Sequence, residues 1–190
     1  MSGSDGALCI VCAHRLHNTH APFQSPPEFS TLYNYTDPHR NTFMGMVSAV
    51  ESTVMNVTGA MRAAGLWENS VFVWATDNGS PVNAGGSNHP LRGSKGGDWE
   101  GGVRVPAFLS GGVVEALGTA GKTLNGIVAI ADLFTTFAAL AGVDGTAEPN
   151  PESPSAVDGL DMWKYFSGAN ATSPRAEYVY DNLNFTKGEY

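Results

Sequence analysis

The 190-residue sequence has few cysteines, few positive charges and no long apolar run. Two cysteines are too few for the disulfide framework of a small secreted domain. Ten Lys and Arg residues stand against 18 Asp and Glu, for a net charge of −8. This balance argues against a nucleic-acid partner, because phosphate contacts need clustered basic side chains. No run approaches the roughly 18 apolar residues that span a bilayer, so no transmembrane segment is expected.

The remaining composition is that of a folded domain. Hydrophobic residues make up 42% of the chain, and a chain near 150 residues already buries roughly two thirds of its unfolded surface. We expect one folded domain over residues 7–182, with a tail or the start of a further region at 183–190. The 23 glycines concentrate between Gly79 and Gly112, which is typical of loops at a functional site.

Hydrophobic patterning predicts alternating strands and helices. Continuous apolar runs predict strands at 7–13, 70–76 and 103–109, and a shorter one is expected at 178–180. Apolar side chains spaced by three and four predict helices over 42–64 and 125–141. Each helix is followed by a glycine suited to the C′ position, Gly65 and Gly142. The order strand, helix, strand indicates an α/β fold with a parallel sheet.

Asp77 and Asn78 directly follow the second predicted strand. Ligands of open α/β sheets gather at the carboxyl ends of the strands. A neighbouring carboxylate and amide supply hard oxygen ligands, which suit Ca²⁺ or Mg²⁺ better than zinc. The same residues also fit an ordinary Asp-Asn-Gly turn.

Two further side chains could act on an anionic ester. Lys95 lies in the glycine-rich loop, where its ammonium group could pair with a sulfate or phosphate oxygen. His20 follows the first predicted strand and could protonate a leaving oxygen near neutral pH. Either residue could instead be a solvated loop side chain. If the strands are neighbours in a parallel sheet, both residues converge with Asp77 and Asn78 on one crevice.

The two cysteines form a C-x-x-C pair, Cys9 and Cys12, on the first predicted strand. A redox pair needs a helix N-terminus to stabilise the thiolate, and no helical pattern starts here. We interpret them as small, half-buried strand residues rather than as a redox or metal site.

Specific motifs run through most of the chain. They are His20–Pro26, Thr76–Gly79, Ala84–Asn88, Pro90–Lys95, Trp99–Ala107, Ala131–Thr136 and Asp158–Trp163. With these motifs the chain resembles the sulfatase family, and within it the arylsulfatase B-like members. The resemblance implies an alkaline-phosphatase-like α/β sandwich, with a mostly parallel sheet flanked by helices and incomplete at its N-terminus. It also implies the hydrolysis of sulfate esters.

The resemblance assigns roles to single residues. In the family, the Asp-Asn of the T-D-N-G stretch ligates a divalent metal, usually Ca²⁺ with Mg²⁺ possible, which corresponds to Asp77 and Asn78. The lysine of P-L-R-G-x-K binds the sulfate, which corresponds to Lys95. The histidine of H-x-P-x-Q contacts the sulfate and helps the leaving group, which corresponds to His20. The implied substrate is a small sulfate ester or a sulfated glycan.

The chain departs from the family at the nucleophile. The family uses a formylglycine made from the cysteine of a C-x-P-x-R or C-x-A-x-R signature, and neither Cys9 nor Cys12 fits it. The early aspartate pair that completes the metal site is also missing. We therefore expect the second half of a sulfatase domain, inactive by itself. The alternatives are a non-catalytic truncated or degenerate protein, or a phosphoester or phosphonate hydrolase of the same superfamily.

Four N-x-T sequons point to the secretory pathway. They begin at Asn34, Asn56, Asn170 and Asn184. The first residues lack the basic region and cleavage site of a signal peptide. The sequons and the resemblance together predict a secreted or lysosomal full-length form. The sequence does not indicate an oligomeric state.

Overall fold

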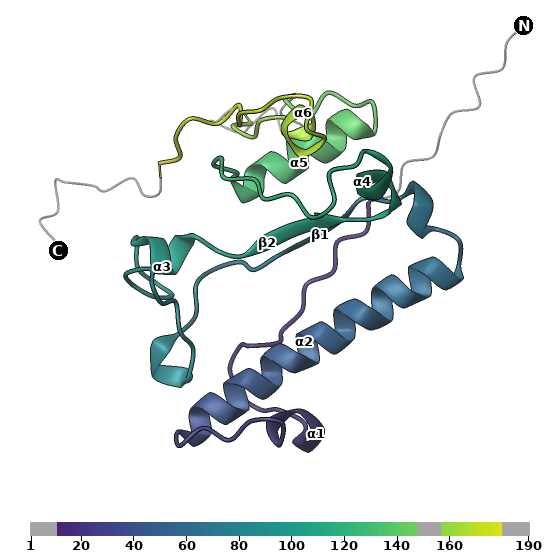
Figure 1. Ribbon diagram of the computed structural model, residues 1–190. Helices are drawn as coiled ribbons and strands as arrows, with labels where there is room; N and C mark the ends of the chain where they lie inside the picture. Colours follow the sequence, from purple (N-terminus) through teal and green to yellow (C-terminus); the bar gives the residue numbers. More distant parts are fainter. Residues whose placement is uncertain (1–10, 148–156, 180–190) are drawn as a thin grey trace, which may run out of the picture. The chain divides into compact units, whose positions relative to one another are not determined.

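The computed structural model describes residues 11–147 and 157–179, which fall into two compact units (Figure 1). Arg15–Ala116 form the N-terminal unit, and Met1–His14 with Leu117–Tyr190 form the C-terminal unit. His20, Asp77, Asn78 and Lys95 all belong to the N-terminal unit. No helix in the described ranges is both long and apolar enough to cross a membrane.

Most of the regular structure belongs to the N-terminal unit. In chain order its elements are α1 (Pro27–Ser30), α2 (Pro38–Ala63), the 3₁₀ turn η1 (Trp67–Asn69), β1 (Phe72–Ala75), the 3₁₀ turn η2 (Val82–Ala84), α3 (Glu100–Val103), β2 (Ala107–Ser110) and α4 (Gly112–Ala116).

The helix predicted over 42–64 is α2, which begins four residues earlier, at Pro38. Its N-cap is Asp37, whose Oδ1 accepts a hydrogen bond of 2.9 Å from the His39 N–H. At the other end Gly65 has φ +67° and donates to the Arg62 carbonyl, while Leu66 donates to Met61. This pair of bonds is a Schellman motif, so the predicted role of Gly65 is confirmed.

The start of α2 carries the packed part of the helix. Phe43, Gly45 and Met46 are buried, and α1 lies against this end in Figure 1. A Cβ on Gly45 would meet Ser25 and the backbone of Ser30, so glycine permits the close approach. Val47 and Val57, which belong to the apolar stripe that the helical period predicted, are exposed.

The sheet differs from the mostly parallel one that was expected. In the described ranges the one strand pair, β1 with β2, is antiparallel, with Phe72 opposite Ser110 and Ala75 opposite Ala107. Residues 76–106 join the two strands through short turns and loops, without the long crossover helix that a parallel pair requires. Trp74 stacks on Phe108 across the pair, with ring centroids 5.5 Å apart.

The strand predicted over 103–109 is divided between two elements. Its first residue ends α3, and its last three lie in β2. Gly102 and Val103 both donate to the Trp99 carbonyl, which turns the backbone into a helical turn. Pro106 has no N–H for the ladder, and β2 begins directly after it.

The strands predicted at 7–13 and 178–180 are not formed in those of their residues that the structure describes. Residues 7–10 and Tyr180 lie outside the described residues, as do Cys9, Asn184 and the predicted tail at 183–190. Val11, Cys12 and Ala13 are exposed and outside any strand, and Tyr178 is not in one either. The interpretation of Cys12 as half-buried is therefore wrong, because no neighbouring strand covers it in the described ranges.

The C-terminal unit contains α5 (Ile130–Leu140) and α6 (Trp163–Phe166). The helix predicted over 125–141 begins five residues late because other contacts use the preceding backbone. The Gly126 N–H donates to Tyr165 Oη at 2.7 Å, and the Ile127 carbonyl accepts from Ser173 Oγ at 2.6 Å. Gly142, at φ +72°, closes α5 as predicted.

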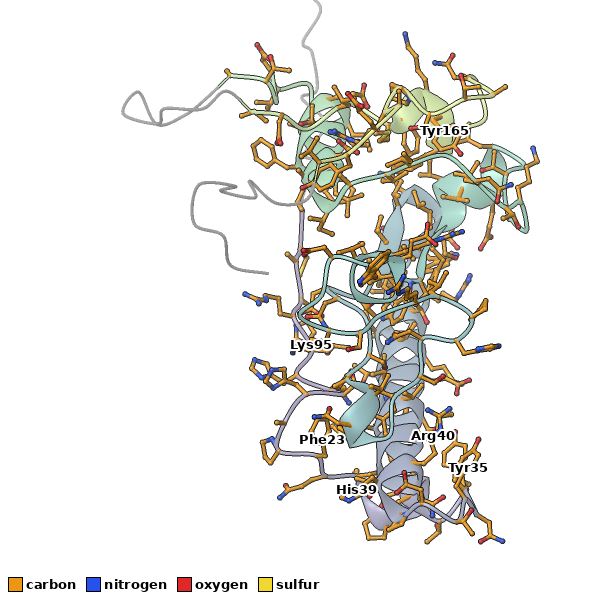
Figure 2. The ribbon with its side chains drawn as sticks, turned by 90° about the vertical axis from the view of Figure 1, so that its left-hand side faces the viewer. Phe23, Tyr35, His39, Arg40, Lys95 and Tyr165 are labelled. Atoms are coloured by element: carbon orange, nitrogen blue, oxygen red, sulfur yellow. The ribbon has the colours of Figure 1, made fainter. Side chains whose placement is uncertain are left out.

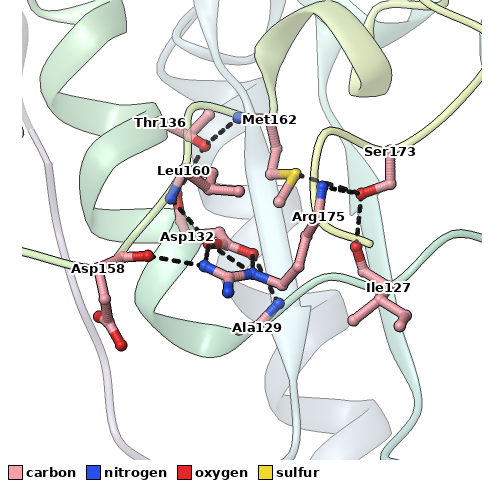
Figure 3. A network of polar contacts seen from close by, with 9 residues as sticks. All are labelled: Ile127, Ala129, Asp132, Thr136, Asp158, Leu160, Met162, Ser173 and Arg175. Carbon is pink, nitrogen blue, oxygen red and sulfur yellow. Dashed lines mark hydrogen bonds and ion pairs between the residues drawn. The ribbon is translucent and has the colours of Figure 1, made fainter. Parts of the chain in front are cut away.

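A buried ion pair organises the C-terminal unit (Figure 3). Asp132 on α5 is fully buried, and Arg175 Nε donates to its Oδ2 at 2.9 Å. The same carboxylate accepts from the backbone N–H groups of Ala129 and Leu160, at 2.7 and 2.8 Å. Thr136 Oγ1 accepts from the Met162 N–H at 2.9 Å. These bonds tie two separate chain segments, at Leu160–Met162 and at Arg175, to α5 and its N-cap residue Ala129.

The network changes how Asp132 titrates. Burial raises the pKa of Asp132, but hydrogen bonds from Arg175, Leu160 and Ala129 outweigh it and hold the pKa below its ordinary 3.8. A carboxylate with a lowered pKa stabilises the folded state above its ordinary pKa, and this contribution is lost as the pH falls through the folded-state pKa.

Breaking the pair should unfold this unit locally. Arg175→Met leaves a buried carboxylate unpaired, which we expect to cost about 3–5 kcal/mol of unfolding free energy. Hydrogen-exchange protection of the α5 amides measures the loss. The double variant Asp132→Leu with Arg175→Met should recover part of it, because no charge stays buried alone.

The pH dependence provides the control for this prediction. Native α5 protection factors should hold from neutral pH down to about 4 and fall below that, and Asp132→Asn should remove the step. Unchanged α5 protection in Arg175→Met would show that the ion pair does not hold the unit together.

Candidate functional site

The predicted metal ligands lie where β1 ends. Thr76 continues the ladder with an N–H bond to the Pro106 carbonyl at 3.4 Å, and Asp77 and Asn78 follow directly. Asp77 is exposed and Asn78 is half-buried. The Asn78 Nδ2 group donates to the Gly79 carbonyl at 2.9 Å, which leaves its Oδ1 available as an oxygen ligand.

Backbone meets backbone directly behind this pair. The Gly79 N–H donates to the Gly102 carbonyl at 2.8 Å, and the Gly101 N–H donates to the Arg92 carbonyl at 2.7 Å. A Cβ on Gly79 would run into the Gly101 carbonyl oxygen, and one on Gly102 would run into that of Gly97. Only glycine permits these approaches, so the glycine concentration has a structural reason in addition to loop flexibility.

One asparagine side chain holds the glycine-rich loop in register. Asn88 Oδ1 accepts from the Ser80 N–H at 2.7 Å, while its Nδ2 donates to the Ser80 carbonyl at 2.9 Å and the Gly93 carbonyl at 3.2 Å. The Ser80 carbonyl also accepts from the Lys95 N–H at 3.4 Å. This bond ties the backbone of Lys95 to Ser80, which lies two residues after Asn78 in the chain.

Lys95 itself is exposed, on the surface of this loop (Figure 2). It has a second cation nearby in the sequence, Arg92, whose guanidinium lies 3.8 Å from the ring centroid of Trp99. This contact closes the loop on itself, because the backbone of residue 92 also receives the Gly101 N–H. Lys95 is therefore the cation of the pair that is left to meet a ligand.

His20 is not joined to the other three residues. Its Nδ1 donates to the neighbouring Ala21 carbonyl at 2.9 Å, and its ring faces His17 edge-on at 6.3 Å. Because a carbonyl only accepts, Nδ1 must carry the proton in the neutral ring. Nε2 is then the nitrogen left to exchange a proton with a ligand. The predicted convergence of His20 with Asp77, Asn78 and Lys95 remains a prediction.

The residues present fit a divalent cation only in part. Asp77 and Asn78 offer oxygen ligands of the type that Ca²⁺ prefers, but Ca²⁺ takes six to eight. Across the described ranges no group of three or more His, Cys, Asp or Glu side chains could hold a metal ion. Asp77 and Asn78 by themselves could therefore provide only part of the ligand set of such a site, and their role as metal ligands remains a prediction.

Sequence reasoning missed two organising contacts. Asn88 belongs to one of the sulfatase-like motifs, but no role was predicted for it. The sequence shows only a polar side chain in a glycine-rich stretch, while the structure adds its three hydrogen bonds to the backbone. The stacking of Arg92 on Trp99 was also not predicted, because the two residues lie in an irregular loop, where sequence spacing does not indicate contacts.

Adding one methyl group should test the backbone contacts. In Gly101→Ala the new Cβ would meet the carbonyls of Arg92 and Gly93, so we expect a loss of about 1–3 kcal/mol and shifted amide signals over residues 77–102. The matched control is Gly59→Ala on α2, which has no atom within 4 Å of the new Cβ and gains helix propensity of about 1 kcal/mol. An unshifted loop in Gly101→Ala would refute the close approach.

Comparisons with known proteins place the chain in a family. The family model described as Sulfatase matches residues 14–143. Mouse arylsulfatase J is 34% identical over 163 residues, which cover 85% of this chain and 26% of that protein. Dog N-acetylgalactosamine-6-sulfatase is 30% identical over 181 residues, 90% of this chain and 31% of that protein.

Solved structures of two different proteins are similar in fold to this chain. Ps i-CgsB in complex with k-i-k-neocarrahexaose matches with a TM-score of 0.68 and 34% identity, over 77% of this chain and 31% of that chain. PsFucS1 sulfatase from Pseudoalteromonas sp. matches with a TM-score of 0.64 and 26% identity, over 82% of this chain and 29% of that one.

The chain thus spans about a quarter to a third of the length of the relatives it matches. The family model covers more than half of the chain and includes the strand end, the glycine-rich loop and His20. The chain belongs to the sulfatase family.

Proposed function

We propose that this chain contributes the sulfate-binding part of a sulfuric ester hydrolase of the arylsulfatase type. The observation that carries the proposal is the loop from Asp77 to Gly102. Its glycine contacts and the Asn88 side chain hold a pair of hard oxygen ligands and one free ammonium group on the same rigid backbone. Such a loop suits an anionic ester that is shared between a cation and a lysine.

Each side chain has a task in this proposal. Lys95 pairs with a sulfate oxygen, and its compact charge is worth most where water is excluded. His20, with its proton on Nδ1, can take up a second proton at Nε2 and pass it to the leaving oxygen. In this mechanism His20 lies beside the ester, and the one hydrogen bond that its ring makes among the described residues is with the Ala21 carbonyl.

Asp77 and Asn78 would hold the divalent cation. When bound, Ca²⁺ would neutralise charge on the sulfate and make its sulfur easier to attack. Both side chains have oxygen atoms available for this role. Asp77 is exposed, and among the described residues the Asn78 side chain makes a hydrogen bond through its amide nitrogen alone. Further oxygen ligands would be needed to complete the six to eight that Ca²⁺ takes.

The nucleophile is the part that these residues do not supply. The 190 residues contain no C-x-P-x-R or C-x-A-x-R signature, and the described cysteine, Cys12, is exposed and free. We therefore propose that the chain by itself does not turn over sulfate esters and at most binds the anion.

A sulfated glycan is the substrate that the comparisons favour. One solved relative is bound to k-i-k-neocarrahexaose, and another relative is named for N-acetylgalactosamine 6-sulfate. Both names contain a sugar, and we extend that substrate class to this chain.

We also propose that the protein passes through the secretory pathway. Asn34, Asn56 and Asn170 are all exposed, as glycosylation requires. Expression with a secretion signal should give a mass that falls on treatment with an N-glycosidase. An unchanged mass would contradict this.

Replacing Lys95 tests the central assignment. In the longest open reading frame that contains these residues, Lys95→Ala should lower kcat/KM for an aryl sulfate by about 10²–10³-fold, because it removes one preorganised charge contact. The matched control is Lys122→Ala, an exposed lysine of the C-terminal unit, which should leave turnover unchanged.

Three outcomes would contradict the proposal. One is unchanged turnover in Lys95→Ala. Another is turnover by the purified 190-residue chain alone with Ca²⁺ present. The third is faster turnover of aryl phosphate than of aryl sulfate by the protein that this open reading frame encodes, which would favour a phosphoester hydrolase.

A further inference from the structure

A polar groove lies at the start of α2, and Lys95 is not among its lining residues. It measures about 430 Å³, a size typical of small-molecule sites, and is open to solvent. Tyr35, Asp37, Arg40, Gly85, Gly86 and Ser87 line it. Figure 2 shows Tyr35 and Arg40 close together near the start of α2, with Lys95 clearly apart from them.

The groove is built from side chains with fixed positions. Asn41 clamps the backbone of Tyr35, accepting from its N–H at 2.7 Å and donating to its carbonyl at 3.0 Å. Tyr33 stacks on the Tyr35 ring at 6.1 Å and is itself bonded to Ser48 at 2.6 Å. Two hydrogen bonds and a ring contact therefore hold the aromatic wall of the groove without a ligand.

The opposite wall is held by Arg40. Its Nη1 donates to the Gly85 carbonyl at 2.6 Å, and its guanidinium carbon lies 5.5 Å from the centroid of the Tyr35 ring. Gly85 has φ +89°, and a Cβ there would meet the His39 carbonyl. The bond joins the helix start to the loop at 85–87 across the groove.

Several hydrogen-bonding atoms of the lining residues have no partner in the described part of the chain and are available to a ligand. In the described part of the chain, Arg40 Nε and Nη2 have no partner, and Asp37 Oδ2 has none because His39 bonds only Oδ1. Ser87 Oγ accepts from the His89 N–H at 3.3 Å and keeps its own proton to donate. The groove thus offers donors, one charged acceptor and an aromatic edge.

This combination suits a sugar ring better than an inorganic anion. Neighbouring hydroxyls of a sugar both donate and accept, so one carboxylate and one guanidinium can satisfy a pair of them. The apolar C–H groups of the ring can lie along an aromatic side chain. A free sulfate would instead be repelled by Asp37.

We propose that this groove is a saccharide subsite that binds a sugar ring remote from the reacting sulfate ester. The inference rests on the proposed function and deepens it, because it makes the substrate an oligosaccharide or polysaccharide. Because Lys95 is not among the residues that line the groove, the proposed glycan places one ring in the groove and its sulfated ring at Lys95.

The test follows the amide signals of the 190-residue chain in two-dimensional NMR. The probes are neoagarotetraose, desulfated chondroitin tetrasaccharide and inorganic sulfate. We expect at least one tetrasaccharide to shift the amides of Arg40, Gly85 and Ser87 with a millimolar Kd. Inorganic sulfate should leave these amides in place and shift only the loop around Lys95.

Asp37→Asn is the sharpest variant. Asparagine caps a helix as well as aspartate, so α2 keeps its start while the free acceptor becomes a donor. Tetrasaccharide binding should weaken by about tenfold or more, as expected for a site left with a mispaired polar group. Tyr35→Leu, which removes the aromatic edge, should also weaken it.

The matched control is Arg62→Ala. Arg62 also stacks on an aromatic ring, that of Trp67 at 3.9 Å, but lies 22 residues further along α2, about 33 Å away. It should leave saccharide binding unchanged.

The outcomes separate the two proposals. Saccharide shifts at the groove that Asp37→Asn weakens support the subsite, whether or not Lys95 binds sulfate. The subsite is overturned if neither tetrasaccharide shifts the groove, if inorganic sulfate shifts it instead, or if Asp37→Asn and Arg62→Ala have equal effects. Loss of the sulfate shifts around Lys95 would count against the proposed function alone.

Discussion

Direct backbone contact around Gly79, Gly101 and Gly102 is the constraint on which the candidate site depends. The N–H to carbonyl bond from Gly79 to Gly102, at 2.8 Å, joins residues 23 positions apart, and the bond from Gly101 to Arg92, at 2.7 Å, joins residues nine positions apart. Any side chain on these glycines would occupy the space of a carbonyl oxygen. Because the glycines allow this contact, the loop that carries Lys95 folds back against the end of β1, where Asp77 and Asn78 stand.

The same logic applies in the C-terminal unit with different chemistry. There a buried carboxylate, Asp132, gathers N–H groups from three directions and pairs with Arg175. The N-terminal unit uses an uncharged side chain, Asn88, for the equivalent task of joining loop segments. In both units one polar side chain with several backbone partners joins segments that have no strand pairing of their own.

Local features of the sequence predicted more of the structure than long-range ones. The helical period and the glycines at 65 and 142 indicated α2 and the end of α5, because both depend on near neighbours. The strand order was missed, since pairing of β1 with β2 depends on a connection of thirty-one residues. Residue chemistry and the motif resemblance both pointed to the candidate site residues, whose roles stay predictions, but neither pointed to Asn88, whose three backbone partners appear only in the folded loop. Whether His20 joins the site depends on contacts that no local pattern encodes.

The most direct test of the account measures the backbone contacts in the unmodified chain. Hydrogen exchange should show the Gly79, Gly101 and Lys95 amides protected together, with Gly96, which has no bond partner among the described residues, exchanging quickly as an internal reference. Exchange of Gly79 and Gly101 as fast as Gly96 would contradict the claim that this loop is a preorganised sulfate-binding element.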